Sequence, residues 1–173
     1  MTTFDLAVLS LGLAVGLTFA AHGAQKAFGW WGGPGMTGWQ AAMEQMGFRP
    51  ARLFAVVSMA AELVGGLFLA IGFLTPFAAA VVVAQTTVII LQVHLAKGFW
   101  VAKGGIEFAL QLGIGALALG LLGRGGLSLD GALGWGFAVS TRVDLLILGL
   151  VVGVLSVAIP RLGRQHGPTP QAR

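Results

Sequence analysis

Five apolar segments, each about as long as a bilayer-spanning helix, constrain the fold of this chain more than any other feature. They cover roughly Phe4 to Ala21, Leu53 to Phe73, Pro76 to Leu95, Ile106 to Leu122 and Val143 to Ile159. A helix needs about 20 apolar residues to cross the hydrocarbon core, with a range of about 17 to 25. The sequence therefore predicts an all-α, polytopic membrane helix bundle. The fifth segment is short and carries Asp144 at its edge.

Charged residues are too scarce for a water-soluble surface. Only 9% of the 173 residues are charged and 57% are hydrophobic, whereas an ordinary soluble domain is about a quarter charged. The chain contains no cysteine, which excludes disulfides, thiolate metal sites and an intrinsic dithiol relay. The net charge of +4 does not indicate nucleic-acid binding, because the basic residues lie between apolar runs, where the positive-inside rule accounts for them.

The basic residues of the connections predict an orientation in the membrane. Two of them, Arg124 and Arg142, lie on one side, and eight lie on the other. These eight are Lys26, Arg49, Arg52, Lys97, Lys103, Arg161, Arg164 and Arg173. The positive-inside rule then places the N-terminus outside and the C-terminus in the cytoplasm of an inner (plasma) membrane. The polar tail at 161–173 is expected to be disordered.

The first connection, residues 22–52, contains a short amphipathic segment. Met36, Trp39, Met43 and Met46 recur at spacings of three and four, which is typical of a helix with one apolar face. Such a helix either lies in the membrane interface or packs on the end of the protein's own bundle.

Small residues predict where helices pack closely. Gly12 and Gly16 in the first apolar segment, and Gly149 and Gly153 in the last, have the G-x-x-x-G spacing that lets membrane helices approach each other. The pattern is common in apolar helices, so it indicates close packing without identifying the partner helix.

Polar residues at the ends of the apolar segments share one membrane level. His22, Lys26, His94 and Glu107 all fall on the predicted cytoplasmic side, near the start or end of a segment. Gln111 follows Glu107 by one helical turn and extends this polar line inward. The line is therefore expected to run from one end of the bundle toward its middle.

Two polar residues are expected deeper in the membrane. Glu62 and Gln85 lie nine and ten residues from the cytoplasmic ends of their segments, which corresponds to roughly 14 to 15 Å of helix. An ionised carboxylate at that depth costs several kcal/mol, so Glu62 must face the bundle interior, protonated or paired. With Lys26 expected near the surface, we predict a neutral Glu62. It either fixes helix register through Gln85 or a backbone carbonyl, or has a function of its own.

The spacing of histidines and carboxylates argues against two kinds of inorganic site. His22 and His94 lie at one level and could hold a haem, but the chain lacks a C-x-x-C-H attachment motif. A metal site built from these histidines with Glu62 and Glu107 lacks the Glu-x-x-His pair of a di-iron bundle. The sequence therefore predicts no metal site and disfavours haem.

Three polar motifs follow one another along the first two thirds of the chain. They are "HGAQKAFGWWGGPG" (22–35), "AELVGGLFLAIGFLT" (61–75) and "HLAKGFWVAKGGIEF" (94–108). In this order they resemble the DoxX family of small bacterial membrane proteins, whose pattern matches His22, Lys26, Glu62, His94 and Glu107. The resemblance covers about residues 5–125 and implies a four-helix domain at 1–125. A further loop and a fifth transmembrane helix at 126–160 depart from it.

The resemblance implies a link to redox chemistry. The family is similar to the membrane subunit of a thiosulfate:quinone oxidoreductase, and mycobacterial members are linked to a membrane complex with a sulfurtransferase and a superoxide dismutase. The candidate catalytic residues are Glu62, His94 and Glu107. The candidate cofactor-binding residues are His22, Lys26, Gln85, Phe99, Trp100 and Gln111. Among these, Phe99 and Trp100 are expected to wall an apolar slot for a quinone ring beside His94.

Three functional hypotheses remain open. The chain is a quinone-linked redox subunit of a membrane oxidoreductase complex, with Glu62 and Gln85 passing protons. Alternatively, it is a non-catalytic anchor that docks a soluble redox enzyme at the cytoplasmic face, or a carrier of a small lipophilic solute. Because cysteine is absent, electrons would have to come through a partner or a bound cofactor. Whether the chain catalyses a reaction or forms a homo-oligomer stays open.

Overall fold

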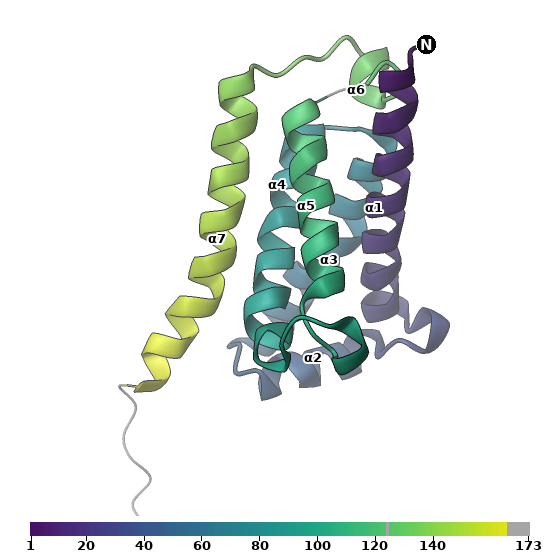
Figure 1. Ribbon diagram of the computed structural model, residues 1–173. Helices are drawn as coiled ribbons and strands as arrows, with labels where there is room; N and C mark the ends of the chain where they lie inside the picture. Colours follow the sequence, from purple (N-terminus) through teal and green to yellow (C-terminus); the bar gives the residue numbers. More distant parts are fainter. Residues whose placement is uncertain (124, 166–173) are drawn as a thin grey trace, which may run out of the picture.

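The computed structural model describes residues 1–123 and 125–165, and over these residues the chain forms helices and loops without strands (Figure 1). The long helices are α1 (Thr3–Phe28), α3 (Ala51–Ile71), α4 (Thr75–Ile89), α5 (Glu107–Leu122) and α7 (Val139–Gln165). Short elements are the 3-10 turn Trp30–Gly32, α2 (Gly35–Gln45), the π-helical turn Ile90–His94, the 3-10 turns Leu95–Lys97 and Val101–Lys103, and α6 (Leu129–Ala132). The predicted all-α polytopic bundle is confirmed.

Helix lengths differ from the prediction at the C-terminal end. Within the described residues, four helical stretches are long and apolar enough to cross a membrane: Thr3–Phe28, Ala51–Ile71, Thr75–Lys97 and Val139–Ala158. The short apolar helix is α5, with 16 residues, or about 24 Å of helix against a core about 30 Å thick. The prediction that the fifth segment is the short one is therefore wrong.

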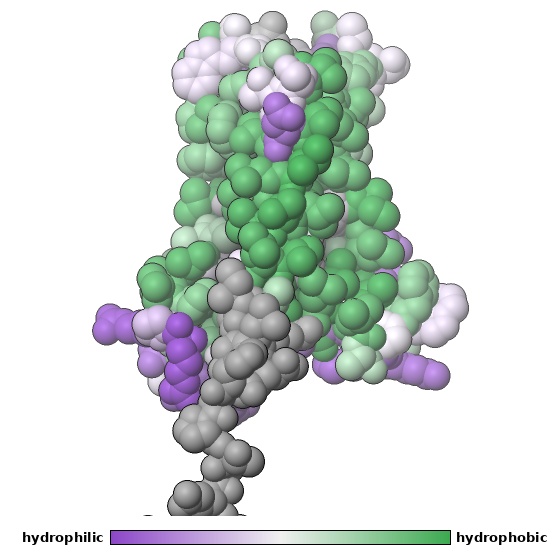
Figure 2. All heavy atoms as spheres, turned by 90° about the vertical axis from the view of Figure 1, so that its left-hand side faces the viewer, coloured by the Kyte–Doolittle hydropathy of each residue, from purple (hydrophilic) through white to green (hydrophobic). Residues whose placement is uncertain are grey.

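The connections gather at the two ends of the bundle (Figure 1). The N-terminus, the α3–α4 turn and α6 lie at one end, and α2 and the loop after α4 lie at the other. A hydrophobic band covers the middle of the face shown in Figure 2, and hydrophilic residues gather mainly at the α2 end. Lys97 and Lys103 are exposed at this end. Of the basic residues used to predict orientation, Arg124 and Arg173 fall outside the described residues.

α1 and α3 pack with their backbones in contact because glycines line their interface. A Cβ atom on Gly16 would lie 2.6 Å from the carbonyl oxygen of Gly66, and one on Gly23 would lie 2.7 Å from Cα of Leu63. Both distances are shorter than real Cβ contacts allow. The predicted close packing of the Gly12–Gly16 segment is therefore found, and its partner is α3.

α7 packs on α4 in the same way. A Cβ atom on Gly149 would meet the carbonyl of Ala80, and one on Gly153 would lie 2.6 Å from the carbonyl oxygen of Ala84. The helix continues past Pro160 to Gln165, so the first five residues of the tail expected to be disordered are helical, since Leu, Arg and Gln are good helix formers. Residues 166–173, including His166, lie outside the described residues.

α2 packs on the protein's own bundle. Met43, Phe48 and Ala55 form a buried apolar cluster, and Met36 and Trp39 pack against it. The apolar face predicted from the Met and Trp spacing therefore covers the end of α3. Of the two hypotheses for this segment, packing on the bundle is the one observed.

Asp130 in α6 caps a distant helix. Its carboxylate is fully buried and accepts hydrogen bonds from the backbone N–H groups of Leu74 and Thr75, both at 2.8 Å, and from the Thr75 hydroxyl at 2.7 Å. The first N–H groups of a helix lack partners within it, and a negative charge there is favourable. Asp130 thus completes the start of α4, where the N-cap residue, Leu74, supplies no side-chain bond.

Candidate functional site

A cavity of about 240 Å³ lies inside the bundle, toward the α2 end. Four residues that the sequence singled out line it: His22 and Lys26 from α1, Glu62 from α3 and His94 after α4. The remaining lining is apolar or aromatic apart from one threonine, and consists of Phe19, Trp39, Thr86, Ile89, Val93, Phe108, Ala109 and Leu112. Polar groups from three parts of the chain therefore converge on one apolar space.

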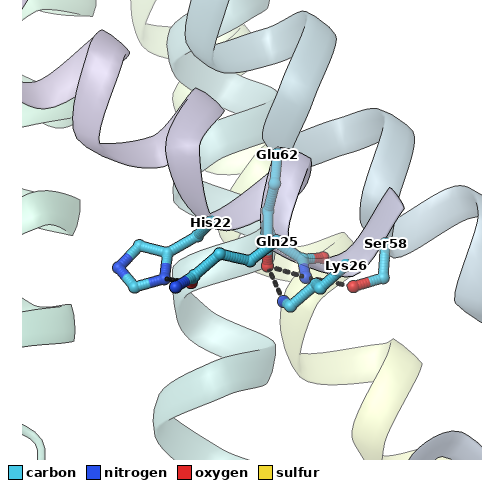
Figure 3. Close-up of polar contacts among 6 residues, drawn as sticks. His22, Gln25, Lys26, Ser58 and Glu62 are labelled. Carbon is cyan, nitrogen blue, oxygen red and sulfur yellow. Dashed lines mark hydrogen bonds and ion pairs between the residues drawn. The ribbon is translucent and has the colours of Figure 1, made fainter. Parts of the chain in front are cut away.

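Lys26 and Glu62 form an ion pair between α1 and α3 (Figure 3). The Lys26 ammonium bonds to Glu62 Oε1, and the two side chains are only 13% and 1% exposed. The same ammonium lies 4.0 Å from the centroid of the Trp39 ring, a cation–π contact that adds to its stabilisation.

The expectation that Lys26 lies near the surface, on which the prediction of a neutral Glu62 rested, is corrected by this pair. α1 does not stop near Ala21 but continues to Phe28, and Gly23 packs against Leu63. Lys26 therefore reaches the level of Glu62, which lies eleven residues from the start of α3 and nine from its end. At about 1.5 Å per residue, the pair lies about 14 to 16 Å from either end of the helix.

Gln85 on α4 links the Glu62 carboxylate to Ser58 through two hydrogen bonds. Its amide Nε2 donates to Glu62 Oε1 at 3.0 Å and to the Ser58 hydroxyl oxygen at 2.7 Å. The hydrogen bond expected between Gln85 and Glu62 is present. Ser58 is not among the site residues predicted from the sequence, although it precedes Glu62 by four residues and so lies on the same face of the helix.

Two polar atoms of cavity-lining residues are buried without a hydrogen-bond partner among the described residues: Glu62 Oε2 and Trp39 Nε1. The first is an acceptor and the second is a donor. A buried polar group without a partner costs about 1 to 3 kcal/mol. Both residues line the cavity.

The two histidines present their rings to the cavity in a defined way. His22 Nδ1 lies 3.1 Å from the amide oxygen of Gln25, and its ring meets Phe108 edge to face. His94 Nδ1 donates to the carbonyl oxygen of Gly104. In a neutral imidazole with a proton on Nδ1, the other ring nitrogen is an acceptor. His94 therefore offers a proton acceptor through Nε2.

Residues 7–95 match the model of the DoxX family, which is 89 of the 173 residues. The chain belongs to the DoxX family. The match includes α1 to α4 and ends after His94, so it is shorter than the resemblance over about residues 5–125. Searches of curated proteins and of solved structures found no match.

Three site candidates beyond the DoxX match do not line the cavity. Phe99 and Trp100 are 49% and 61% exposed and pack edge to face on each other, and Gln111 is exposed on α5. The expected aromatic wall beside His94 is therefore corrected. In this DoxX protein, Phe19, Trp39 and Phe108 supply the aromatic rings of the cavity.

Glu107, the fourth candidate beyond the match, is hydrogen bonded to the loop that precedes α5. Its Oε2 accepts from the backbone N–H of Val101 at 2.9 Å, and its own N–H donates to the carbonyl of Phe99. Among the described residues of this DoxX chain, no group of three or more His, Cys, Asp or Glu side chains is arranged to hold a metal ion.

Proposed function

We propose that this DoxX protein binds the ring of a quinone in the 240 Å³ cavity and is the quinone-linked subunit of a membrane oxidoreductase complex. The observation that carries the proposal is the convergence of Trp39, Glu62 and His94 on one largely apolar space at one end of a bundle of membrane helices. Ligand pockets are mostly apolar, with a few well-placed polar groups that fix orientation.

The size and chemistry of the cavity suit a single ring. Its volume lies just below the roughly 300 to 1,000 Å³ of typical ligand pockets. A quinone carbonyl accepts a hydrogen bond, which Trp39 can donate, and a quinol hydroxyl donates one, which Glu62 Oε2 can accept. The aromatic rings of Trp39 and Phe108 supply flat apolar surface for the head group.

In the proposed complex, this chain accepts the protons of the reaction, and the electrons leave through another protein or group. Oxidation of a quinol releases two protons and two electrons. His22, His94 and Glu62 are the groups lining this cavity that can accept the protons. Because the chain has no cysteine, the electrons must pass to a partner protein or a second bound group.

Binding of a water-soluble benzoquinone to the protein in mild detergent tests the proposal. We expect quenching of tryptophan fluorescence that saturates, and about tenfold weaker binding by His94→Ala, since a hydrogen bond is worth about 1 to 1.5 kcal/mol. Gln111→Ala, on α5 outside the cavity, is the control and should bind like the wild type. Absence of saturable binding by the wild type, or an equal loss in the control, contradicts the proposal.

A second function, that of an anchor for a soluble redox enzyme, is favoured by exposed cations at the α2 end. Arg52, Lys97 and Lys103 are all exposed there, and surface charges steer association in a salt-dependent way. Under this alternative, Lys97→Ala/Lys103→Ala should lose a co-purifying protein at low salt, whereas His94→Ala should keep it.

The orientation proposed from the basic residues puts the α2 end in the cytoplasm of the inner (plasma) membrane and the N-terminal end outside. The chain is a natural cysteine-free background, so single cysteines can report each side. In intact cells, an impermeant maleimide should label Leu133→Cys, at the α6 end, and label Lys103→Cys only after permeabilisation. The reverse pattern would invert the orientation.

A further inference from the structure

A second, larger space adjoins the cavity. An apolar groove of about 460 Å³ runs between α5 and α7, with α4 as its floor. Its walls include Ile114 and Leu117 of α5 and Leu146 and Leu150 of α7. Figure 1 shows α7 diverging from α5 toward the α2 end. At the opposite end the two helices are joined by Arg142, whose guanidinium donates to the carbonyls of Leu121 and Leu122.

The groove and the cavity meet at one side chain. Thr86 lines both spaces. Gly113 stands opposite it on α5, and a Cβ atom there would lie 3.0 Å from Thr86 Oγ1. The Thr86 hydroxyl is already bonded to the carbonyls of Val82 and Val83, so it makes no polar barrier. Thr86 is only 2% exposed and packs on Gly113, so these two residues form a closed wall that is one residue thick.

The π-helical turn Ile90–His94 shapes the same boundary. Its first residue, Ile90, lines the groove, whereas Val93 and His94 line the cavity. The N–H of Leu95 bonds back to the carbonyl of Ile90, five residues earlier. Such turns insert an extra residue into a helix and are frequent at functional sites. Here, residues of this one turn line both the groove and the cavity.

We propose that the groove between α5 and α7 holds the hydrocarbon tail of the quinone whose ring occupies the cavity, and that Thr86 and Gly113 form the threshold between them. The inference rests on the proposed function. An acyl chain of a lipid would fit the groove alone, but a cavity lined by His94 and Glu62 lies only one residue away, which favours a molecule with a polar ring and an apolar tail that parts Thr86 from Gly113 when it binds. Because the groove faces the bilayer, the tail enters sideways from lipid.

The tail and the ring of the quinone are expected to contribute differently to its affinity. Moving the tail from lipid into the groove gains little hydrophobic free energy, since both surroundings are apolar. The groove matters because the ring can seat only if its tail has an exit. Filling the groove should therefore weaken long-tailed quinones and spare tail-less ones, whose equilibrium affinity does not depend on the exit.

The test compares a tail-less dimethoxy-methyl-benzoquinone with its decyl derivative on two groove variants. Gly113→Leu fills the threshold, and Ile114→Trp fills the groove from an exposed position without crowding Thr86. We expect each to weaken decyl-quinone binding at least tenfold and to change tail-less binding less than twofold. Gln111→Leu, elsewhere on α5, should change neither.

Four other outcomes would overturn the groove assignment, and one of them would also overturn the proposed function. Unchanged decyl affinity in folded Ile114→Trp overturns the groove assignment, and so does an equal loss of both ligands. Binding of the tail-less quinone alone by the wild type leaves the proposed function standing and overturns this inference. Binding of neither ligand by the wild type overturns both.

Discussion

Replacing Lys26 with methionine should lower the free energy of unfolding by about 3 to 5 kcal/mol, because it leaves the buried Glu62 carboxylate without its counter-ion. Methionine keeps much of the apolar stem of lysine and so limits the loss of packing. Unfolding by a denaturing detergent, followed by circular dichroism in mixed micelles, measures the change. The double variant Lys26→Met/Glu62→Gln should recover most of it, since no buried charge remains.

An exposed ion pair of the same chain provides the control. Arg49 and Glu44 also form a salt bridge, at 2.8 Å, but their side chains are 72% and 54% exposed. Arg49→Met should cost less than about 1 kcal/mol, as is usual for surface pairs. If Lys26→Met costs no more than Arg49→Met, or if the double variant is as unstable as the single one, the pair does not stabilise the fold as a pair.

Gly16→Ala should destabilise the protein by about 3 kcal/mol, the upper end for overpacking. In a helix with open space, the same substitution would add about 1 kcal/mol of stability through helix propensity. The sign should reverse here because the new methyl group meets the backbone of Gly66 and Ala70, which cannot rotate away. The resulting separation of α1 from α3 should also weaken the Lys26–Glu62 contact.

The same unfolding assay checks this substitution against a matched glycine. Gly136 has no atom within 4 Å of a built Cβ, so Gly136→Ala should change stability by less than about 0.5 kcal/mol. A neutral or stabilising Gly16→Ala would mean that α1 and α3 are less closely packed than described.

The apolar segments predicted the helix bundle because a membrane leaves few other ways to satisfy the backbone. They also put Glu62 and Gln85 on neighbouring helices at a common depth, and these two residues are hydrogen bonded. What the segments could not predict is how far each helix continues beyond its apolar core. α1 continues through polar residues to Phe28, and this extension carries Lys26 to Glu62.

The loop after α4 shows a second limit. Phe99 and Trp100 follow His94 closely, and proximity in sequence suggested a common site. Their direction is set by backbone bonds that only the fold determines, from Ile106 N–H to the Gly98 carbonyl and from Glu107 N–H to that of Phe99. In the loop held by these bonds, the rings of Phe99 and Trp100 are exposed and do not face the cavity. The aromatic partner of the site comes instead from Trp39, more than 50 residues earlier.

The cap that Asp130 places on α4 links the order of synthesis to the order of folding. The ribosome delivers α4 long before it delivers Asp130, so Leu74 and Thr75 enter the membrane without the acceptor that later joins their N–H groups. The first turn of α4 becomes complete only after α5 has been made and α6 has folded back across the end of the bundle. A nascent chain that stalls or is cut between α5 and α6 would therefore expose an unfinished helix start, which quality-control proteases could recognise.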